Sequence, residues 1–323
     1  MAENTGISWA HDTWNPWMGC DKVGPECRHC YIDRQKCFNG EREAFGSVNR
    51  TKTTWDNPHK WEIDCAIHNY AKRVFTCSIS DFFHAKADAW RDEAWRIIKK
   101  SSRLAWLILT KRPALIESRL PADWGEGYPN VWLGVSTGCN KTLHRMDMLR
   151  KIPAAVRWVS TEPLLEDVSQ DINFDGFHWV VTGGESGFGE EYMYDPKDDW
   201  RMVTRKISVD NDDIDLPLNP NYKIVQVPAA KETVLGRRTM MLKWAENLRD
   251  VTKAAGLAFM FKQVTAPNSG VGVNALGRDW HEFPPAPHGL AWAPRNPIPA
   301  KNHWTDVQIE NLWTEQNQRK SGV

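Results

Sequence analysis

Short apolar runs rich in Val, Ile, Phe and Trp alternate with amphipathic stretches along most of the chain. In each run nearly every residue is apolar, as expected of a strand that is buried on both faces. We therefore predict a strand just before Cys20 and six more, at residues 73–80, 104–110, 131–136, 156–160, 178–182 and 257–262. Helical periodicity lies between them, at residues 86–100, 113–119, 141–150 and 239–255.

This alternation of strand and helix is the rhythm of βα units, which place their strands in a parallel sheet. Six or seven such units favour an α/β fold with a full or partial parallel (β/α) barrel. A flat, doubly wound sheet has the same rhythm and is the alternative.

Polar and charged residues follow each of the six later strands directly. Any strand that leaves a core must become polar, so one such end carries little information. Six together indicate a shared site, because barrels and open α/β sheets build their sites at the carboxyl ends of their strands. The polar ends are Ser80-Asp81, Thr110-Lys111-Arg112, Ser136-Thr137, Ser160-Thr161-Glu162, Gly183-Gly184-Glu185 and Lys262-Gln263.

Two segments interrupt the rhythm. Residues 188–235 form an irregular insertion, acidic in its first half and followed by three prolines, which is typical either of a lid or binding element or of a solvated decoration. The chain after residue 265 is rich in Pro, Gly, Asn and Trp and ends in a helical pattern at 305–318. We predict a barrel domain over residues 1–283, interrupted by the insertion, and a tail over 284–323 that packs on the barrel.

Charge and composition narrow the class of protein. The chain has 323 residues, with 41 Lys and Arg against 41 Asp and Glu, and 41% hydrophobic residues. These values exclude a disordered protein and one drawn to nucleic acid by net charge alone. The apolar run at 104–109 is far shorter than the roughly 20 residues that span a bilayer, and the N-terminus lacks a signal-peptide core. We expect a cytoplasmic protein without membrane contact.

The strongest local signal is the motif Cys20-x6-Cys27-x2-Cys30 in a loop containing glycine and proline. Three thiolates on one loop can hold three irons of a [4Fe-4S] cube and leave the fourth iron open. With Cys37, four thiolates would instead make a closed zinc knuckle or a fully ligated cluster, and His29 is another conceivable ligand. Spacing alone leaves these possibilities open, together with unligated cysteines. Cys65, Cys77 and Cys139 are scattered and fit small buried residues.

Several longer stretches occur in the order found in one known family. They are residues 5–9 (TGISW), 13–17 (TWNPW) with Gly19-Cys20, 27–31 (CRHCY), 78–84 (SISDFFH), 109–113 (LTKRP), 130–136 (NVWLGVS), 160–165 (STEPLL), 183–187 (GGESG) and 261–263 (FKQ). In these stretches the chain resembles the phage-associated three-cysteine-motif branch of the radical S-adenosylmethionine superfamily. The resemblance covers residues 5–187 and 236–283.

This resemblance implies a cofactor and a type of reaction. Cys20, Cys27 and Cys30 would hold a [4Fe-4S] cluster, and S-adenosylmethionine would bind the remaining iron through its amino and carboxylate groups. An electron donor such as flavodoxin or ferredoxin would reduce the cluster. Cleavage of the sulfonium bond would then give methionine and a 5′-deoxyadenosyl radical, which takes hydrogen from an unactivated carbon.

The resemblance also assigns roles at the strand ends. Gly183-Gly184-Glu185 is similar to the Gly-Gly-Glu element that meets the methionyl amino group in many superfamily members, although a substrate role for Glu185 is an alternative. The expected cofactor contacts are Gly183, Gly184, Glu185, Ser136, and Ser80 and Asp81 as alternative partners of the amino group. The expected catalytic or substrate contacts are Lys111, Arg112, Glu162 and Lys262. Lys111 and Arg112 suit a carboxylate or phosphate, unless they are ordinary surface cations.

The phage association of this family suggests a substrate. We expect a nucleobase or nucleobase adduct in DNA, or a modified nucleotide, that is rearranged or modified after hydrogen abstraction. Cations near residues 99–112 and at Arg237-Arg238 would meet phosphates. Two alternatives stay open: a lyase that repairs damaged bases, as in the photoproduct lyases that this branch distantly resembles, and a zinc-stapled phage binding protein without catalysis.

Overall fold

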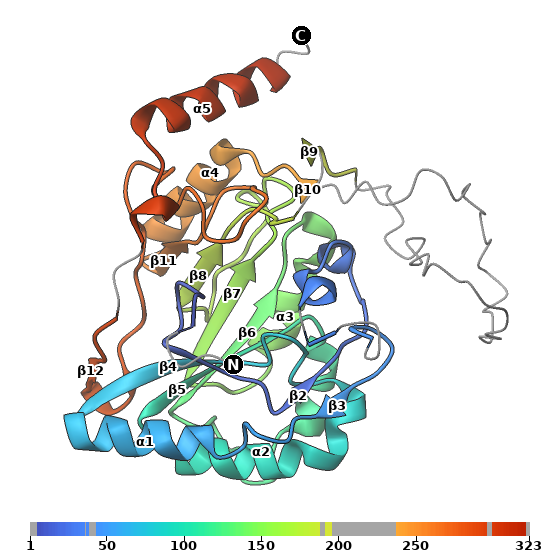
Figure 1. Ribbon diagram of the computed structural model, residues 1–323, viewed down its shortest axis with the longest axis vertical. Helices are drawn as coiled ribbons and strands as arrows, with labels where there is room; N and C mark the ends of the chain where they lie inside the picture. The colour runs from blue at the N-terminus through green and yellow to red at the C-terminus, as the bar shows by residue number, and fades with distance from the viewer. Residues whose placement is uncertain are drawn as a thin grey trace, which may run out of the picture.

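A curled sheet of parallel strands forms the centre of the computed structural model, which describes residues 5–35, 37–38, 43–187, 191–195, 237–295 and 299–320. The strand β12 (Ala291–Trp292) pairs with the start of β4 (Tyr70–Thr76). The path of the sheet has two ends, so it forms part of a barrel, and the predicted α/β partial parallel barrel is confirmed (Figure 1). Across the sheet the order is β1 (Asp12–Trp14), β4 (Tyr70–Thr76), β5 (Leu104–Thr110), β6 (Val131–Ser136), β7 (Val156–Thr161), β8 (Trp179–Thr182) and β11 (Ala258–Phe261).

Helices cover the outer face of this sheet, where a large apolar cluster lies between the two layers. Two small strand pairs flank the sheet: β2 (Trp17–Met18) with β3 (Asn49–Arg50), and β9 (Glu191–Tyr192) with β10 (Arg237–Arg238). The α-helices are α1 (Asn57–His68), α2 (Asp88–Lys100), α3 (His144–Arg150), α4 (Leu242–Ala254) and α5 (Asp306–Lys320). The 3₁₀ turns are η1 (Pro25–Cys27), η2 (Tyr31–Arg34), η3 (Ala85–Ala87), η4 (Pro113–Leu115), η5 (Glu117–Arg119), η6 (Asn140–Thr142), η8 (Pro287–Gly289) and η9 (Ala300–Asn302).

Most predicted elements are present, and the differences have local causes. The strand predicted at 73–80 ends at Thr76, because Cys77 adopts a left-handed backbone conformation with a φ of 62°. The helix predicted at 113–119 consists of the two 3₁₀ turns η4 and η5. The helix α1 was missed, since it buries only Pro58, Trp61 and Cys65 and its apolar periodicity is weak. The predicted insertion lies outside the described residues except for 191–195.

Aromatic side chains fill the inner face of the sheet at the amino ends of the strands. Trp9, Trp132, Trp158 and Trp179 pack together there, with ring centroids of Trp158 and Trp179 5.0 Å apart. Gly134 makes this packing possible, because a Cβ at that position would lie 2.4 Å from the Trp158 ring. This end of the barrel is therefore closed by indole rings.

Two buried basic residues complete the closed end. His11 accepts a hydrogen bond from the Arg73 main-chain N–H at Nδ1 (2.8 Å), so its Nε2 donates to the Ala293 carbonyl (3.1 Å) and the ring is neutral. Burial chiefly, and then the charge of Arg73, lower the pKa of His11 to about 3. Arg73 itself is 4% exposed and donates to the Trp9 carbonyl, with its guanidinium 3.8 Å from the Phe283 ring. These contacts fasten the N-terminal segment and the tail to β4.

Candidate functional site

The opposite end of the inner face carries polar residues instead of indoles. Side chains alternate between the faces of a strand, so residues two positions beyond an inward-facing one face inward as well. From Leu109, which packs against the inner cluster, this period leads to Lys111 directly after β5, and from Met260 it leads to Lys262 after β11. Along β6 and β7 it leads from the clustered tryptophans to Ser136 and Glu162. These four predicted site residues therefore line the mouth of the barrel.

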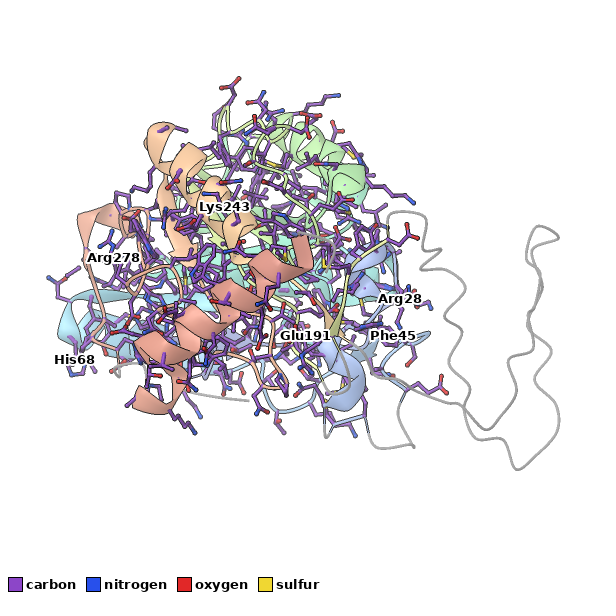
Figure 2. The ribbon with its side chains drawn as sticks, turned by 90° about the horizontal axis from the view of Figure 1, so that it is seen from above. Arg28, Phe45, His68, Glu191, Lys243 and Arg278 are labelled. Atoms are coloured by element: carbon purple, nitrogen blue, oxygen red, sulfur yellow. The ribbon has the colours of Figure 1, made fainter. Side chains whose placement is uncertain are left out.

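The cysteine loop follows β1 and β2 and lies over this mouth. Gly19 holds its start, with its N–H bonded to the Ile79 carbonyl (3.0 Å) and its own carbonyl accepting from the Ser80 hydroxyl (2.5 Å). The Gly19 backbone has a φ of 94°, and a Cβ there would meet the Ser47 carbonyl oxygen at 2.1 Å, so only glycine fits this turn. Ser80, an expected cofactor contact, thus has its hydroxyl engaged by the loop. In Figure 2, Arg28 of the loop and Phe45, which bridges to Cys20, lie across the molecule from His68 of α1.

The three motif thiols interact without forming a site for a single ion. Burial chiefly, and then negative charge on Asp81, Cys27 and Cys30, raises the pKa of Cys20 to about 12, and burial and Cys27 likewise raise the pKa of Cys30. Nevertheless, the described residues contain no three His, Cys, Asp or Glu side chains placed to hold one metal ion. Three thiolates on one loop also suit a polynuclear cluster, in which each sulfur binds a different iron.

A buried ion pair anchors the loop from below. The side chain of Glu26, next to Cys27, is fully buried and lies 3.1 Å from Arg145 of α3. The same oxygen of Glu26 accepts from the Thr142 hydroxyl (2.6 Å) and the Gly138 N–H (3.2 Å). Burial alone would raise the pKa of Glu26, but the charges of Arg145 and Lys111 and the hydrogen bond from Thr142 together outweigh it, and the pKa is lowered. Figure 1 shows the blue turns of the loop beside α3.

A second buried ion pair holds the loop from the side. Arg238 of β10 is 1% exposed, and its Nη2 and Nε donate to the Glu185 carboxylate at 2.5 and 3.1 Å. Its Nη1 donates to the Pro25 carbonyl (2.8 Å), at the start of η1. The His29 ring lies 3.3 Å from Glu185. Burial would raise the pKa of Glu185, but hydrogen bonds from His29 and Arg238 lower it to about 2. Arg238 is consequently not available to a phosphate, contrary to expectation.

Lys111 and Arg112 both approach the loop. Burial would lower the pKa of Lys111, but negative charge on Cys27, Glu26 and Cys30 in the loop raises it. Arg112 donates to the Asp21 carbonyl (2.7 Å), and the same nitrogen lies 4.0 Å from Cys20 Sγ. Positive charge beside thiolates stabilises them, which suits ligands of a metal cluster.

Asp81 has a structural role within this edge of the sheet. Its carboxylate accepts from the Thr110 hydroxyl (2.8 Å) and from the main-chain N–H groups of Lys111 (3.1 Å) and Phe83 (2.9 Å). These bonds join the end of β4 to the end of β5. The side chain is 5% exposed, so its oxygens face protein on most sides.

Glu162 and Lys262 form an acid–base pair across the mouth. The Lys262 ammonium lies 3.0 Å from Glu162 Oε1, and Ser160 donates to Oε2 at 3.4 Å. Gly183 directly follows β8, the strand between β7 and β11, and leaves room for this pair, since a Cβ there would be 2.9 Å from Glu162 Oε1. Gly184 is needed for packing, because a Cβ would meet the Thr265 N at 2.3 Å.

The structure therefore divides the predicted site residues into two groups. Lys111, Glu162, Lys262 and the cysteine loop converge on the mouth, whereas Asp81 and Glu185 bind protein partners. Sequence reasoning missed Glu26 and Arg145 entirely. The only sequence signal for Glu26 was its position between Cys20 and Cys27 in the motif. The structure shows that its side chain is fully buried, and a buried charge requires a partner.

The fold and the loop define a class of protein: a partial parallel α/β barrel with a three-cysteine loop seated over the carboxyl ends of its strands. More particularly, the chain belongs to the family described as "Protein of unknown function (DUF5131)", whose model matches residues 4–216. No curated protein matches the chain.

One solved structure with some similarity is "Spore photoproduct lyase complexed with dinucleoside spore photoproduct", at 11% identity and a TM-score of 0.35. The match covers 52% of this chain and 54% of that one, so the chain spans about half the length of that structure. Among the described residues, no helix has the length and apolar character required to cross a membrane.

Proposed function

We propose that this protein is a radical S-adenosylmethionine enzyme in which Cys20, Cys27 and Cys30 hold a [4Fe-4S] cluster. The observation that carries the proposal is the placement of these thiols on one loop, which buried ion pairs anchor over the barrel mouth. When bound, the cluster would deliver an electron that cleaves S-adenosylmethionine to methionine and a 5′-deoxyadenosyl radical.

The chain's own residues hold and shield this chemistry. The loop is fixed by Glu26 and Glu185 through their arginine partners, so the three sulfurs keep one arrangement. The closed end of the barrel, filled by tryptophans, excludes water from below. Glu162 and Lys262 offer an anion and a cation side by side, which suits a ligand that carries both an ammonium and a carboxylate group.

The substrate we propose is a nucleobase or nucleobase adduct in DNA, rearranged or modified after hydrogen abstraction. The support for this substrate is the family resemblance of the motifs. Lys111, whose ammonium group faces the mouth, would meet an acidic group of the substrate.

The test is anaerobic reconstitution of the full chain, followed by iron and acid-labile sulfide analysis. We expect about four irons and four sulfides per chain. The reduced protein should convert S-adenosylmethionine to 5′-deoxyadenosine, measured by liquid chromatography with nucleosides or DNA added or left out. One tightly held zinc without sulfide would refute the proposal.

Cysteine variants sharpen this test. Cys20→Ser, Cys27→Ser and Cys30→Ser should each lose the cluster, whereas Cys37→Ser should keep it. Cys37 is the matched control because it lies in the same segment and is partly exposed, as Cys20 and Cys30 are. A Cys37→Ser variant that cannot be reconstituted would indicate a four-thiolate site instead.

A further inference from the structure

The pair formed by Arg238 and Glu185 joins three segments that are distant in sequence. Arg238 lies on β10, Glu185 follows β8, and Pro25 lies two residues before Cys27 in the cysteine loop. In addition to its side-chain bonds, the Arg238 main-chain N–H donates to Glu185 Oε2 at 2.7 Å. All three guanidinium nitrogens therefore donate to the strand end or to the loop.

The Glu185 carboxylate has little capacity left for another ligand. Two oxygens provide about four acceptor sites, and Arg238 fills three of them while His29 lies 3.3 Å from Oε2. The side chain is 5% exposed. An incoming ammonium group would have to displace the guanidinium and leave that charge buried without a partner, which is strongly unfavourable.

The geometry points to Arg238 as a positioning residue that holds the cysteine loop against the end of β8, with Glu185 as its counter-ion and not as a contact for the cofactor's amino group. This inference rests on the proposed function, because the loop is positioned for a cluster. It also assigns a role to the segment that follows the insertion: β10 brings the arginine that completes the loop's support.

The cysteine loop has a second anchor besides Arg238, which limits the effect of removing Arg238. Glu26 fixes the loop from the α3 side, so removing Arg238 should loosen the loop without detaching it. The loop carbonyl of Pro25 would lose its donor, and Glu185 would lose its charge partner. We expect the positions of the three cysteine sulfurs to change, while the residues of the barrel mouth stay in place.

The test uses the full chain with Arg238→Met, Arg238→Lys and Glu185→Gln. Outer-shell partners of metal ligands typically change metal affinity about 10- to 100-fold, so we expect Arg238→Met to lose iron to a chelator about tenfold faster or more. The electron paramagnetic resonance signal of the reduced cluster should shift or broaden. Arg238→Lys keeps the charge but not the fork and should be intermediate.

Arg73→Met is the matched control, since Arg73 is an equally buried arginine at the closed end of the barrel. It should lower stability but keep the wild-type resonance signal and rate of iron loss. The affinity for S-adenosylmethionine should change less than about threefold in Glu185→Gln, because the Glu185 carboxylate is occupied by Arg238 and does not contact the cofactor.

Two results would overturn the inference. One is a tenfold weaker binding of S-adenosylmethionine by Glu185→Gln with an unchanged cluster signal, which would make Glu185 a cofactor contact. The other is unchanged hydrogen exchange of residues 19–31 in iron-free Arg238→Met compared with iron-free wild type. This exchange measurement needs no cluster, so it decides the inference even if the wild type fails to bind iron and the proposed function falls.

Discussion

Replacing Arg145 with Met tests whether a buried ion pair supports the cysteine loop. The variant keeps an apolar stem of similar length and removes the guanidinium that lies 3.1 Å from Glu26 and donates to the Ser136 carbonyl at 2.7 Å. Glu26 retains its bonds from the Thr142 hydroxyl and the Gly138 N–H, but its fully buried charge loses its partner.

The expected loss of stability is large because the Glu26 carboxylate stays buried without its charge partner. Removing one member of a buried ion pair typically lowers the free energy of unfolding by about 3–5 kcal/mol. Glu26→Gln in the same background removes the stranded charge, so the double variant should be more stable than the sum of the single effects by about 0.5–3 kcal/mol. The loop next to Cys27 is the first part expected to loosen.

The assay is urea unfolding of the iron-free protein at pH 7, followed by tryptophan fluorescence, with the free energy taken from linear extrapolation. Lys243→Met is the control, because Lys243 pairs with Glu246 at 3.3 Å on an exposed surface, where such pairs contribute about 0–1 kcal/mol. If Arg145→Met costs no more than Lys243→Met, the loop does not depend on this pair and the reasoning is refuted.

Three further substitutions address other parts of the molecule. The pKa of His11 is depressed from 6.5 to about 3, so the unfolded chain binds the proton more readily than the folded chain. The free energy of unfolding should therefore decrease as the pH is lowered below 6.5, by about 2 kcal/mol at pH 5. His11→Gln should abolish this part of the pH dependence of urea unfolding; an unaltered slope would contradict it. Gly183→Ala should displace the Glu162 carboxylate and weaken S-adenosylmethionine binding about tenfold in calorimetry, with near-normal stability; unchanged affinity would remove Glu162 from the site. Gly134→Ala should cost about 1–3 kcal/mol by overpacking against Trp158, and a neutral effect on thermal unfolding would show that the indole can move.

Much of the fold follows from local patterns. The strands β5 and β6 match their predicted ranges residue for residue, since each is an apolar run with polar residues at its end. The weakly amphipathic α1 escaped prediction, and β4 ended early at Cys77, where the backbone turns left-handed. These differences arise where tertiary packing, and not periodicity, sets the boundary of an element.

The sequence by itself determined the alternation of strands and helices, the polar strand ends and the three-cysteine loop, because each depends on residues that are close along the chain. Only the tertiary structure decided which acids remain available at the mouth. Glu185 pairs with Arg238, which is 53 positions away in the sequence, and Glu26 pairs with Arg145, which is 119 positions away. Glu162, by contrast, stays at the mouth with Lys262. Such pairings form when the sheet curls and brings distant segments together, and no local pattern records them.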